Sequence, residues 1–475
     1  MKKVINICLA LLLVVLFGYY INANQIKSDT KLQSSSANSV PSYVKTEARR
    51  VCDLVRTVQT PNTFTIVGIS DPHYLKENSQ VDNAIRDMVF GIKEISAQVP
   101  IDYKIAFGDY IYRGKNGYEN YDDGVVEMKN ITELLNTAFG KNERQIRLTG
   151  NHDANSMELD NGELKKYFTT HDIYQYIGKY NDKKMVTDKL NPEGNYGYID
   201  IPDKKIRIIC LNTSDFTDEG KPPVVANPED NTKNTATAHN MSKRQVEWFA
   251  ETLKLTGIKD TGTWNILVIS HIDLAQDGLK RNMQGNAAVL LSEYVKKHKG
   301  TLSIKGSELP YDYSSIKPAR VLPYIHGHNH TFKVANIKLK NTFKGITRNE
   351  MITIGLPNAC PLRNGKGNTY YKTKGTAKST SFSVIVIDLE KSVVNIFCYG
   401  AGFNRIIHFD SLKVKAFSPH ITLHTVLKGE ITWTSRKNKI VKVSDGKIKP
   451  VSFGNTLVVA EDENGNCEYW DVTVE

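Results

Sequence analysis

The feature that most constrains the fold is a repeated pairing of a short apolar run with a polar side chain that closely follows it. Apolar runs bounded by turn signals are typical of buried strands. In five places such a run is closely followed by Asp, Asn or His, and the runs are Phe64 to Ile69, Tyr103 to Phe107, Gln145 to Leu148, Trp264 to Ile269 and Val321 to Ile325. The chain is therefore expected to gather polar side chains at strand ends.

Segments with helical apolar spacing lie between these strands, at Val81 to Ser96, Val125 to Phe139 and Lys243 to Leu255. Further strands are expected at Ile206 to Leu211 and within Ser381 to Phe409. Strands that alternate with helices predict βαβ units and an α/β sheet. Ligands of such sheets bind beyond the carboxyl ends of the strands. We therefore expect the five polar blocks to form one site.

The residue types in these blocks are those of metal ligands. Carboxylate, amide and imidazole donors without a thiolate suit Mn, Fe, Zn, Ni or Co better than Ca, and the sequence leaves the metal open. Each block alone is weak evidence, whereas five in order, each after a strand, are hard to obtain by chance. The blocks are Asp71-Pro72-His73, Gly108-Asp109, Gly150-Asn151-His152-Asp153, Ser270-His271 and Gly327-His328-Asn329-His330.

The order of these blocks resembles that of the calcineurin-like metallophosphoesterases, over residues 62–410. The resemblance implies an α/β fold in which a two-sheet β-sandwich is flanked by helices, with a dinuclear metal centre at one sheet edge. It also implies which residues would bind each metal ion. Asp71, His73 and His330 would hold the first ion, Asn151, His271 and His328 the second, and Asp109 would bridge them.

The same resemblance implies roles for three catalytic residues. His152 matches the residue that protonates or stabilises the leaving oxygen, Asp153 would orient it, and Arg113 would contact the phosphate. Tyr112 departs from the protein phosphatases, which carry an Asp at this position. Purple acid phosphatases have a tyrosine ligand there but lack the equivalent of His73. We therefore expect Tyr112 to pack beside the site.

These observations predict a dinuclear metal-dependent hydrolase of phosphate mono- or diesters. Two ions about 3.5–4 Å apart can stabilise both the attacking and the leaving oxygen of an in-line displacement. The alternative is a surface binding or adhesion protein whose phosphoesterase domain is degenerate. Substrate identity and the preference for monoester or diester stay open.

The N-terminus reads as a targeting segment. Lys2 and Lys3 precede an apolar run from Val4 to Phe17, which fits a secretory signal peptide. The stretch to Ala23 is also about 20 residues long, enough to span a bilayer, so an uncleaved anchor fits as well. Residues 1–24 therefore predict a secreted protein or one anchored facing outside, and residues 25–61 are read as a linker and lead-in.

Residues 411–475 are expected to form a small all-β domain, because short β-like runs alternate there with turn dipeptides. Trp433-Thr434-Ser435 and Gly446-Lys447-Ile448 resemble a bacterial Ig-like domain of group 2. That resemblance implies attachment to a cell surface or wall. The alternative is a β-extension of the catalytic domain.

The composition favours some classes of binding partner over others. The formal net charge of +11 favours anionic partners such as phosphate esters. The Lys and Arg residues are scattered and form no stripe with aromatic residues, so nucleic acid is not indicated. The six cysteines are widely spaced without a CxxC motif, which predicts a fold that does not depend on disulfides.

Overall fold

The chain divides into two compact units, Met1–Ser42 and Tyr43–Glu475, and the described helices and strands run from α2, which begins at the boundary, into the second unit. The computed structural model describes residues 40–111, 121–140, 144–154, 168–215, 241–274, 283–304, 307–340, 347–362 and 372–475. The predicted targeting segment, Tyr112 and Arg113 lie outside these ranges. Within them, no helix is long and apolar enough to cross a membrane.

The first of two large sheets has nine strands in the order β18-β21-β22-β16-β15-β14-β1-β2-β3. Strands β1, β2 and β3 are parallel to one another, so their carboxyl ends lie at one edge. The strands are β1 Phe64–Ile69, β2 Tyr103–Ala106, β3 Gln145–Arg147, β14 Ser381–Asp388, β15 Val393–Gly400, β16 Arg405–Val414, β18 Ile431–Ser435, β21 Gly454–Asp462 and β22 Cys467–Val474.

The second sheet has eight strands, seven in the order β12-β13-β11-β7-β6-β5-β4 and β10 paired with β7. Strands β6, β7, β11 and β13 run parallel. Strands β1 and β6 coincide with the predicted runs, and the predicted alternation of strands and helices is confirmed. The strands are β4 Val186–Thr187, β5 Gly197–Ile201, β6 Ile206–Leu211, β7 Asn265–Ser270, β10 Arg320–Val321, β11 Tyr324–His326, β12 Lys333–Lys340 and β13 Thr347–Gly355.

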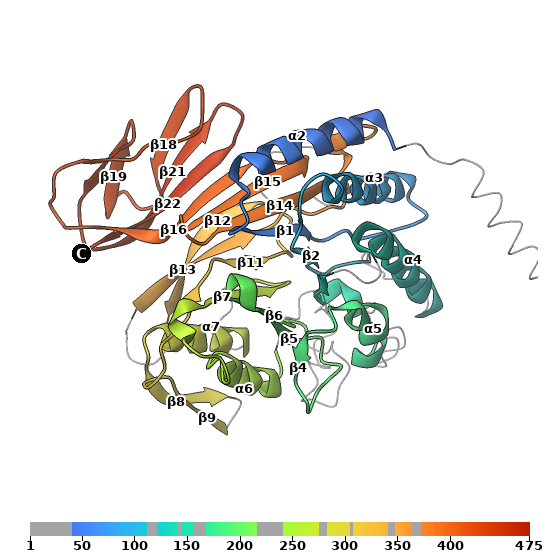
Figure 1. The fold of residues 1–475 in the computed structure, drawn as a ribbon, viewed down its shortest axis with the longest axis horizontal. Coiled ribbons are helices and arrows are strands. Elements are labelled where there is room, and N and C mark those ends of the chain that lie inside the picture. Colours follow the sequence, from blue (N-terminus) through green and yellow to red (C-terminus); the bar gives the residue numbers. More distant parts are fainter. Residues whose placement is uncertain are drawn as a thin grey trace, which may run out of the picture. The chain divides into compact units, whose positions relative to one another are not determined.

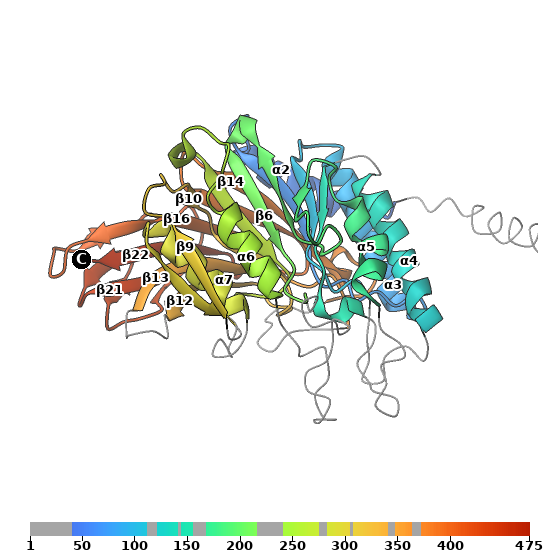
Figure 2. The ribbon, with the colours of Figure 1, turned by 90° about the horizontal axis from the view of Figure 1, so that it is seen from below.

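Six α-helices flank the sheets in the described residues, with α2 and α3 beside the first sheet and α6 and α7 beside the second (Figures 1 and 2). Helix α3 begins where the Asn78 side chain accepts hydrogen bonds from the amides of Gln80 and Val81, which is a typical N-cap. The helices are α2 Ser42–Val58, α3 Ser79–Ser96, α4 Tyr121–Phe139, α5 Thr170–Tyr176, α6 Lys243–Thr252 and α7 Met283–Val295. The sequence missed α2, which lies in the predicted lead-in.

The two sheets enclose one shared apolar core. Ile66 and Ile385 of the first sheet belong to the same buried cluster as Ile208 and Ile269 of the second. A second cluster joins the outer face of the second sheet to α6 and α7. The predicted two-sheet sandwich flanked by helices is therefore confirmed, and burial of apolar surface on both faces of the second sheet holds its layers together.

The C-terminal region is all-β, as predicted, and its strands continue the first sheet. Strand β22 pairs in parallel with β16 from Arg405↔Cys467 to Val414↔Val474. Tyr469 of β22 belongs to the core shared by the two sheets. Three strands of this region, β17 Ile421–Thr422, β20 Lys447–Pro450 and β19 Val441–Ser444, form a separate small sheet. A domain boundary at residue 411 and an Ig-like identity stay predictions.

The described residues include five buried cysteines, none of which forms a disulfide with another. They are Cys52, Cys210, Cys360, Cys398 and Cys467.

We predict that Tyr469→Ala lowers the free energy of unfolding of the whole sandwich by about 3 kcal/mol, because it opens a cavity in the shared core. Urea unfolding followed by circular dichroism would measure the change as one cooperative transition. The matched control is Val426→Ala, since Val426 is 63% exposed and its loss should change the free energy by less than about 0.5 kcal/mol. Two separate transitions, with only the weaker one shifted, would show an independent C-terminal domain.

Candidate metal centre

The seven predicted metal ligands lie just past the carboxyl ends of strands from both sheets. Asp71 follows β1, Asp109 follows β2, and Asn151 begins a short 3₁₀ helix after β3. His271 follows β7, and the His328–His330 turn follows β11. The site is therefore built where the ends of β1, β2 and β3 face those of β7 and β11.

One group of ligands consists of Asp71, His73, Asp109 and His330. Their donor atoms all lie within 4.8 Å of one another. His330 Nε2 is 3.0 Å from His73 Nε2 and 3.2 Å from Asp71 Oδ1. Two imidazole nitrogens and two carboxylates thus converge on one point, as the resemblance implied for the first ion.

The second group consists of Asp109, His271 and His328, whose donor atoms also lie within 4.8 Å of one another. Asn151 Oδ1 lies 3.0 Å from His271 Nε2 and 2.9 Å from His328 Nδ1, so the amide joins this group. Asp109 Oδ2 is 3.2 Å from His271 Nε2 and 3.6 Å from His73 Nε2. The same carboxylate oxygen therefore faces both groups.

The ligand residues have unusual backbone conformations. Non-glycine residues with positive φ are uncommon, each costs about 1–3 kcal/mol, and they concentrate at functional sites. Five of the seven ligands adopt this conformation: Asp71 (φ 50°), His73 (φ 40°), Asp109 (φ 56°), His328 (φ 68°) and His330 (φ 55°). Such local strain persists only where the surrounding structure enforces it, which supports a functional role for the cluster.

Two glycines of the predicted blocks allow the strand ends to approach this closely. A Cβ atom at Gly150 would collide with the backbone nitrogen and carboxylate of Asp109. A Cβ at Gly327 would collide with the Ser70 hydroxyl and lie 2.9 Å from Asp71 Oδ2. Any side chain at either position would push a ligand carboxylate out of place.

Hydrogen bonds orient the ligands from behind. His271 Nδ1 donates to the Phe107 carbonyl at 2.6 Å, which directs its Nε2 toward Asp109. The backbone amide of His328 donates to Asp71 Oδ2 at 3.0 Å, and the amide of His152 donates to Asp109 Oδ1 at 2.8 Å. Partners of this kind fix the orientation and basicity of metal ligands.

Asp153 supports the loops of the site. Its carboxylate accepts hydrogen bonds from the amides of Gly150 at 2.7 Å, Asp109 at 3.1 Å and Tyr110 at 2.7 Å. These bonds join the turn after β2 to the turn after β3. Burial and the neighbouring Asp109 charge raise the pKa of Asp153 to about 8. Its expected role toward His152 stays a prediction, whereas its contacts position the bridging carboxylate.

His152 lies beside the cluster and is partly exposed. Its side chain is 11% exposed, its ring packs edge-on against that of His73, and its Nε2 is 4.0 Å from Asp109 Oδ2. It thus reaches the centre without joining either ligand group.

The charges of the site suit a cation. Burial alone would raise the pKa values of Asp71 and Asp109, but the charges of the nearby histidines, chiefly His330 and His271, lower both well below their usual range. Burial lowers the pKa of His271, but Asp109 outweighs it and raises the value to about 9. Asp71 Oδ1 is buried and accepts no well-aligned hydrogen bond from the described residues. A bound metal would replace the imidazole protons and satisfy this oxygen.

The sequence interpretation missed some partners of the site. Ser70 Oγ donates to Asp71 Oδ2. His326 is buried, with its Nε2 3.7 Å from Asp273 Oδ2, and so links the turns that carry His328 and His271. Ser70, His326 and Asp273 lie inside or next to the predicted blocks in the sequence. This proximity is the signal that could have identified them as partners of the site.

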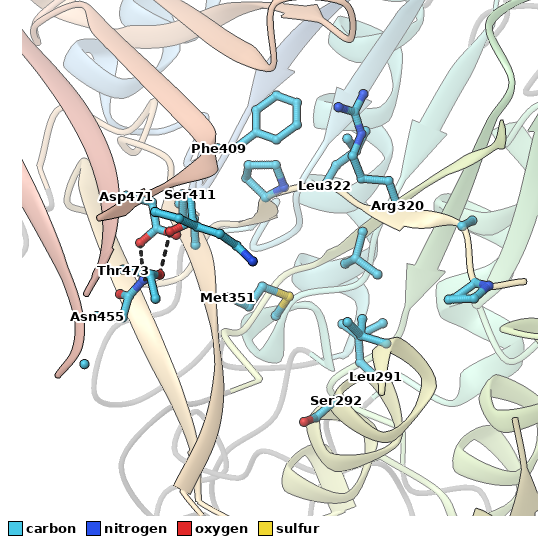
Figure 3. A pocket seen from close by; sticks show the side chains of 18 of the residues that line it. Leu291, Ser292, Arg320, Leu322, Met351, Phe409, Ser411, Asn455, Asp471 and Thr473 are labelled. Carbon is cyan, nitrogen blue, oxygen red and sulfur yellow. Dashed lines mark hydrogen bonds between the residues drawn. The ribbon is translucent and has the colours of Figure 1, made fainter. Parts of the chain in front are cut away.

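A cavity of about 870 Å³ lies elsewhere, between α7, β13 and the strands β16, β21 and β22 (Figure 3). Leu291 and Met351 lie on one side of it, and Phe409, Asp471 and Thr473 on the other. None of the predicted ligands lines it. The metal centre and this cavity are therefore separate features.

No protein-family model matches this chain, and no curated protein matches it. Among solved structures, the NAD nucleotidase NadN of Haemophilus influenzae matches with 10% sequence identity and a TM-score of 0.31. The match covers 77% of this chain and 54% of that one, so this chain spans about half the length of NadN. A likeness this remote carries no argument about activity, which must come from the site itself.

We predict that Asp109→Asn removes bound metal, because both ligand groups lose the same charged oxygen. Elemental analysis after incubation with Mn²⁺ and dialysis should show a clear fall in ions per chain. Asp203→Asn, an exposed surface change, is the matched control and should retain the wild-type content. Equal metal content in the two variants would contradict a bridging role for Asp109.

Proposed function

We propose that this protein is a dinuclear metal-dependent hydrolase of phosphate mono- or diesters. The observation that carries the proposal is the shared oxygen of Asp109, which faces His73 in one ligand group and His271 in the other. Two cations held side by side supply Lewis-acid stabilisation for the attacking and leaving oxygens of an in-line displacement. Asp71, His73 and His330 would hold one ion, with Asn151, His271 and His328 holding the other.

His152 is the best-placed proton donor for the leaving oxygen. Its Nε2 is 4.0 Å from Asp109 Oδ2, its side chain is partly exposed, and its backbone amide is bonded to Asp109. Proton transfer from a positioned side chain contributes about 10²–10⁴-fold to rate. Asp153 keeps the His152 turn attached to the Asp109 turn through its bonds to three amides. The proposed contact of Arg113 with phosphate rests on its place in the sequence.

The setting of the enzyme is also part of the proposal. A basic n-region followed by an apolar run supports action outside the cytoplasm, by a secreted or membrane-anchored protein. The net charge of +11 favours the approach of anionic esters. The Ig-like resemblance of residues 411–475 supports attachment to a cell surface or wall. A degenerate domain used only for binding is disfavoured, because the complete ligand set converges.

Purified protein loaded with Mn²⁺ should hydrolyse p-nitrophenyl phosphate, bis-p-nitrophenyl phosphate or both. Chelation by EDTA should abolish turnover, and adding back Mn, Fe, Zn, Ni or Co one at a time should identify the active metal. Asp109→Asn should lower kcat by about 10²-fold or more, because transition-state charge loses its stabilisation. If the metal-loaded protein turns over neither ester class, the hydrolase proposal fails and the binding protein is favoured.

His152→Gln should lower kcat while leaving the metal content unchanged. The loss should be larger for phenyl phosphate than for p-nitrophenyl phosphate, because nitrophenolate leaves without needing a proton. His171→Gln is the matched control, since His171 is 61% exposed and pairs with Glu193 on the surface. Equal losses for the two esters would rule out proton donation by His152.

A further inference from the structure

One loop outside the predicted blocks forms hydrogen bonds with the ligand-bearing segments of both sheets. This bridging loop, residues 355–360, leaves β13 of the second sheet and runs beside the end of β1 in the first. The amide of Leu356 donates to the His326 carbonyl at 2.8 Å, just before the turn that carries His328. The amides of Ala359 and Cys360 donate to the carbonyls of Ser70 at 2.8 Å and Asp71 at 3.2 Å.

Three amides of the bridging loop thus bond to the segments that carry Asp71 and His328. Three of its carbonyls accept hydrogen bonds from side chains outside the loop. Lys372 Nζ donates to the carbonyls of Asn358 and Cys360, the latter at 3.0 Å, and lies 3.3 Å from Asn358 Oδ1. Thr380 Oγ1 donates to the Ala359 carbonyl at 3.0 Å. All three carbonyls between residues 358 and 360 therefore accept side-chain hydrogen bonds.

The surroundings show why these donors matter. Asn358, Ala359, Cys360 and Thr380 are fully buried, so carbonyls there that lost their donors would lack water to replace them. Burial lowers the pKa of Lys372 to about 7. A lysine head group in such a place is retained through its contacts, and its hydrogen bonds to described residues go to Asn358 and Cys360 of the bridging loop.

We propose that Lys372 is a positioning residue of the metal centre. Its head group holds the bridging loop in the shape that bonds the loop to the Ser70–Asp71 turn and to the strand before His328. It thereby sets the spacing between ligands from the two sheets, and so the metal affinity. The inference rests on the proposed metal-dependent function.

The test compares Lys372→Met, which keeps the side-chain length but removes the donors, with Lys374→Met, an exposed control two residues along. Calorimetric titration of metal-free protein with Mn²⁺ should give a dissociation constant raised about tenfold or more in Lys372→Met and unchanged in the control. Hydrogen exchange of peptides covering residues 356–362 should be faster in Lys372→Met alone, because the Ala359 and Cys360 amides lose their fixed partners.

The exchange measurement needs neither metal nor substrate, so it separates the two proposals. If wild-type protein turns over no ester, the proposed function fails, and the Mn²⁺ titration and the exchange rates still decide the role of Lys372. Wild-type affinity and exchange in Lys372→Met would overturn the inference. Should that variant not fold, Thr380→Val keeps the lysine and removes one donor; a smaller change in both readouts supports the inference, and no change overturns it.

Discussion

The centre depends on the buried carboxylate of Asp109, which is 1% exposed. A charge in such a place is tolerated only with compensating partners. Histidines from both sheets supply them, since His73 follows β1 and His271 follows β7. The amide of His152 satisfies the second oxygen. Because these partners come from separate sheets, the shared core between the sheets is also what keeps the centre assembled.

The site requires backbone conformations that non-glycine residues disfavour. Ligands such as Asp71 and His328 adopt left-handed backbone conformations that cost free energy when isolated. The structure compensates with hydrogen bonds from the bridging loop to the Asp71 turn and to the strand before His328. Asp153 likewise accepts the backbone amide of Asp109, which also has a positive φ. Partners that hold the predicted ligands in place reduce the share of the binding free energy that is spent on ordering them.

The sequence predicted the parts of the fold that leave a local pattern. Strands β1 and β6 and the residues of the candidate metal site were identifiable because apolar runs end at polar residues and sheet geometry brings such ends together. Lys372 left no such signal, because its partners are backbone carbonyls, and any residue type carries those. The pairing of β22 with β16 was also missed, since β-propensity does not name the partner strand. Helix α2 was missed because the polar segment before it led us to read the whole lead-in as a linker.

The continuity of the first sheet gives the C-terminal strands a part in the site. From β22 the order runs through β16, β15 and β14 to β1, which ends at Ile69, just before Asp71. Tyr469 and Ile66 belong to one core, so the two ends of this path are held by the same apolar burial. Edge strands expose unpaired amides and carbonyls, and β22 covers the edge that β16 would otherwise present. The C-terminal strands therefore support the sheet that carries Asp71 and Asp109, two of the predicted metal ligands.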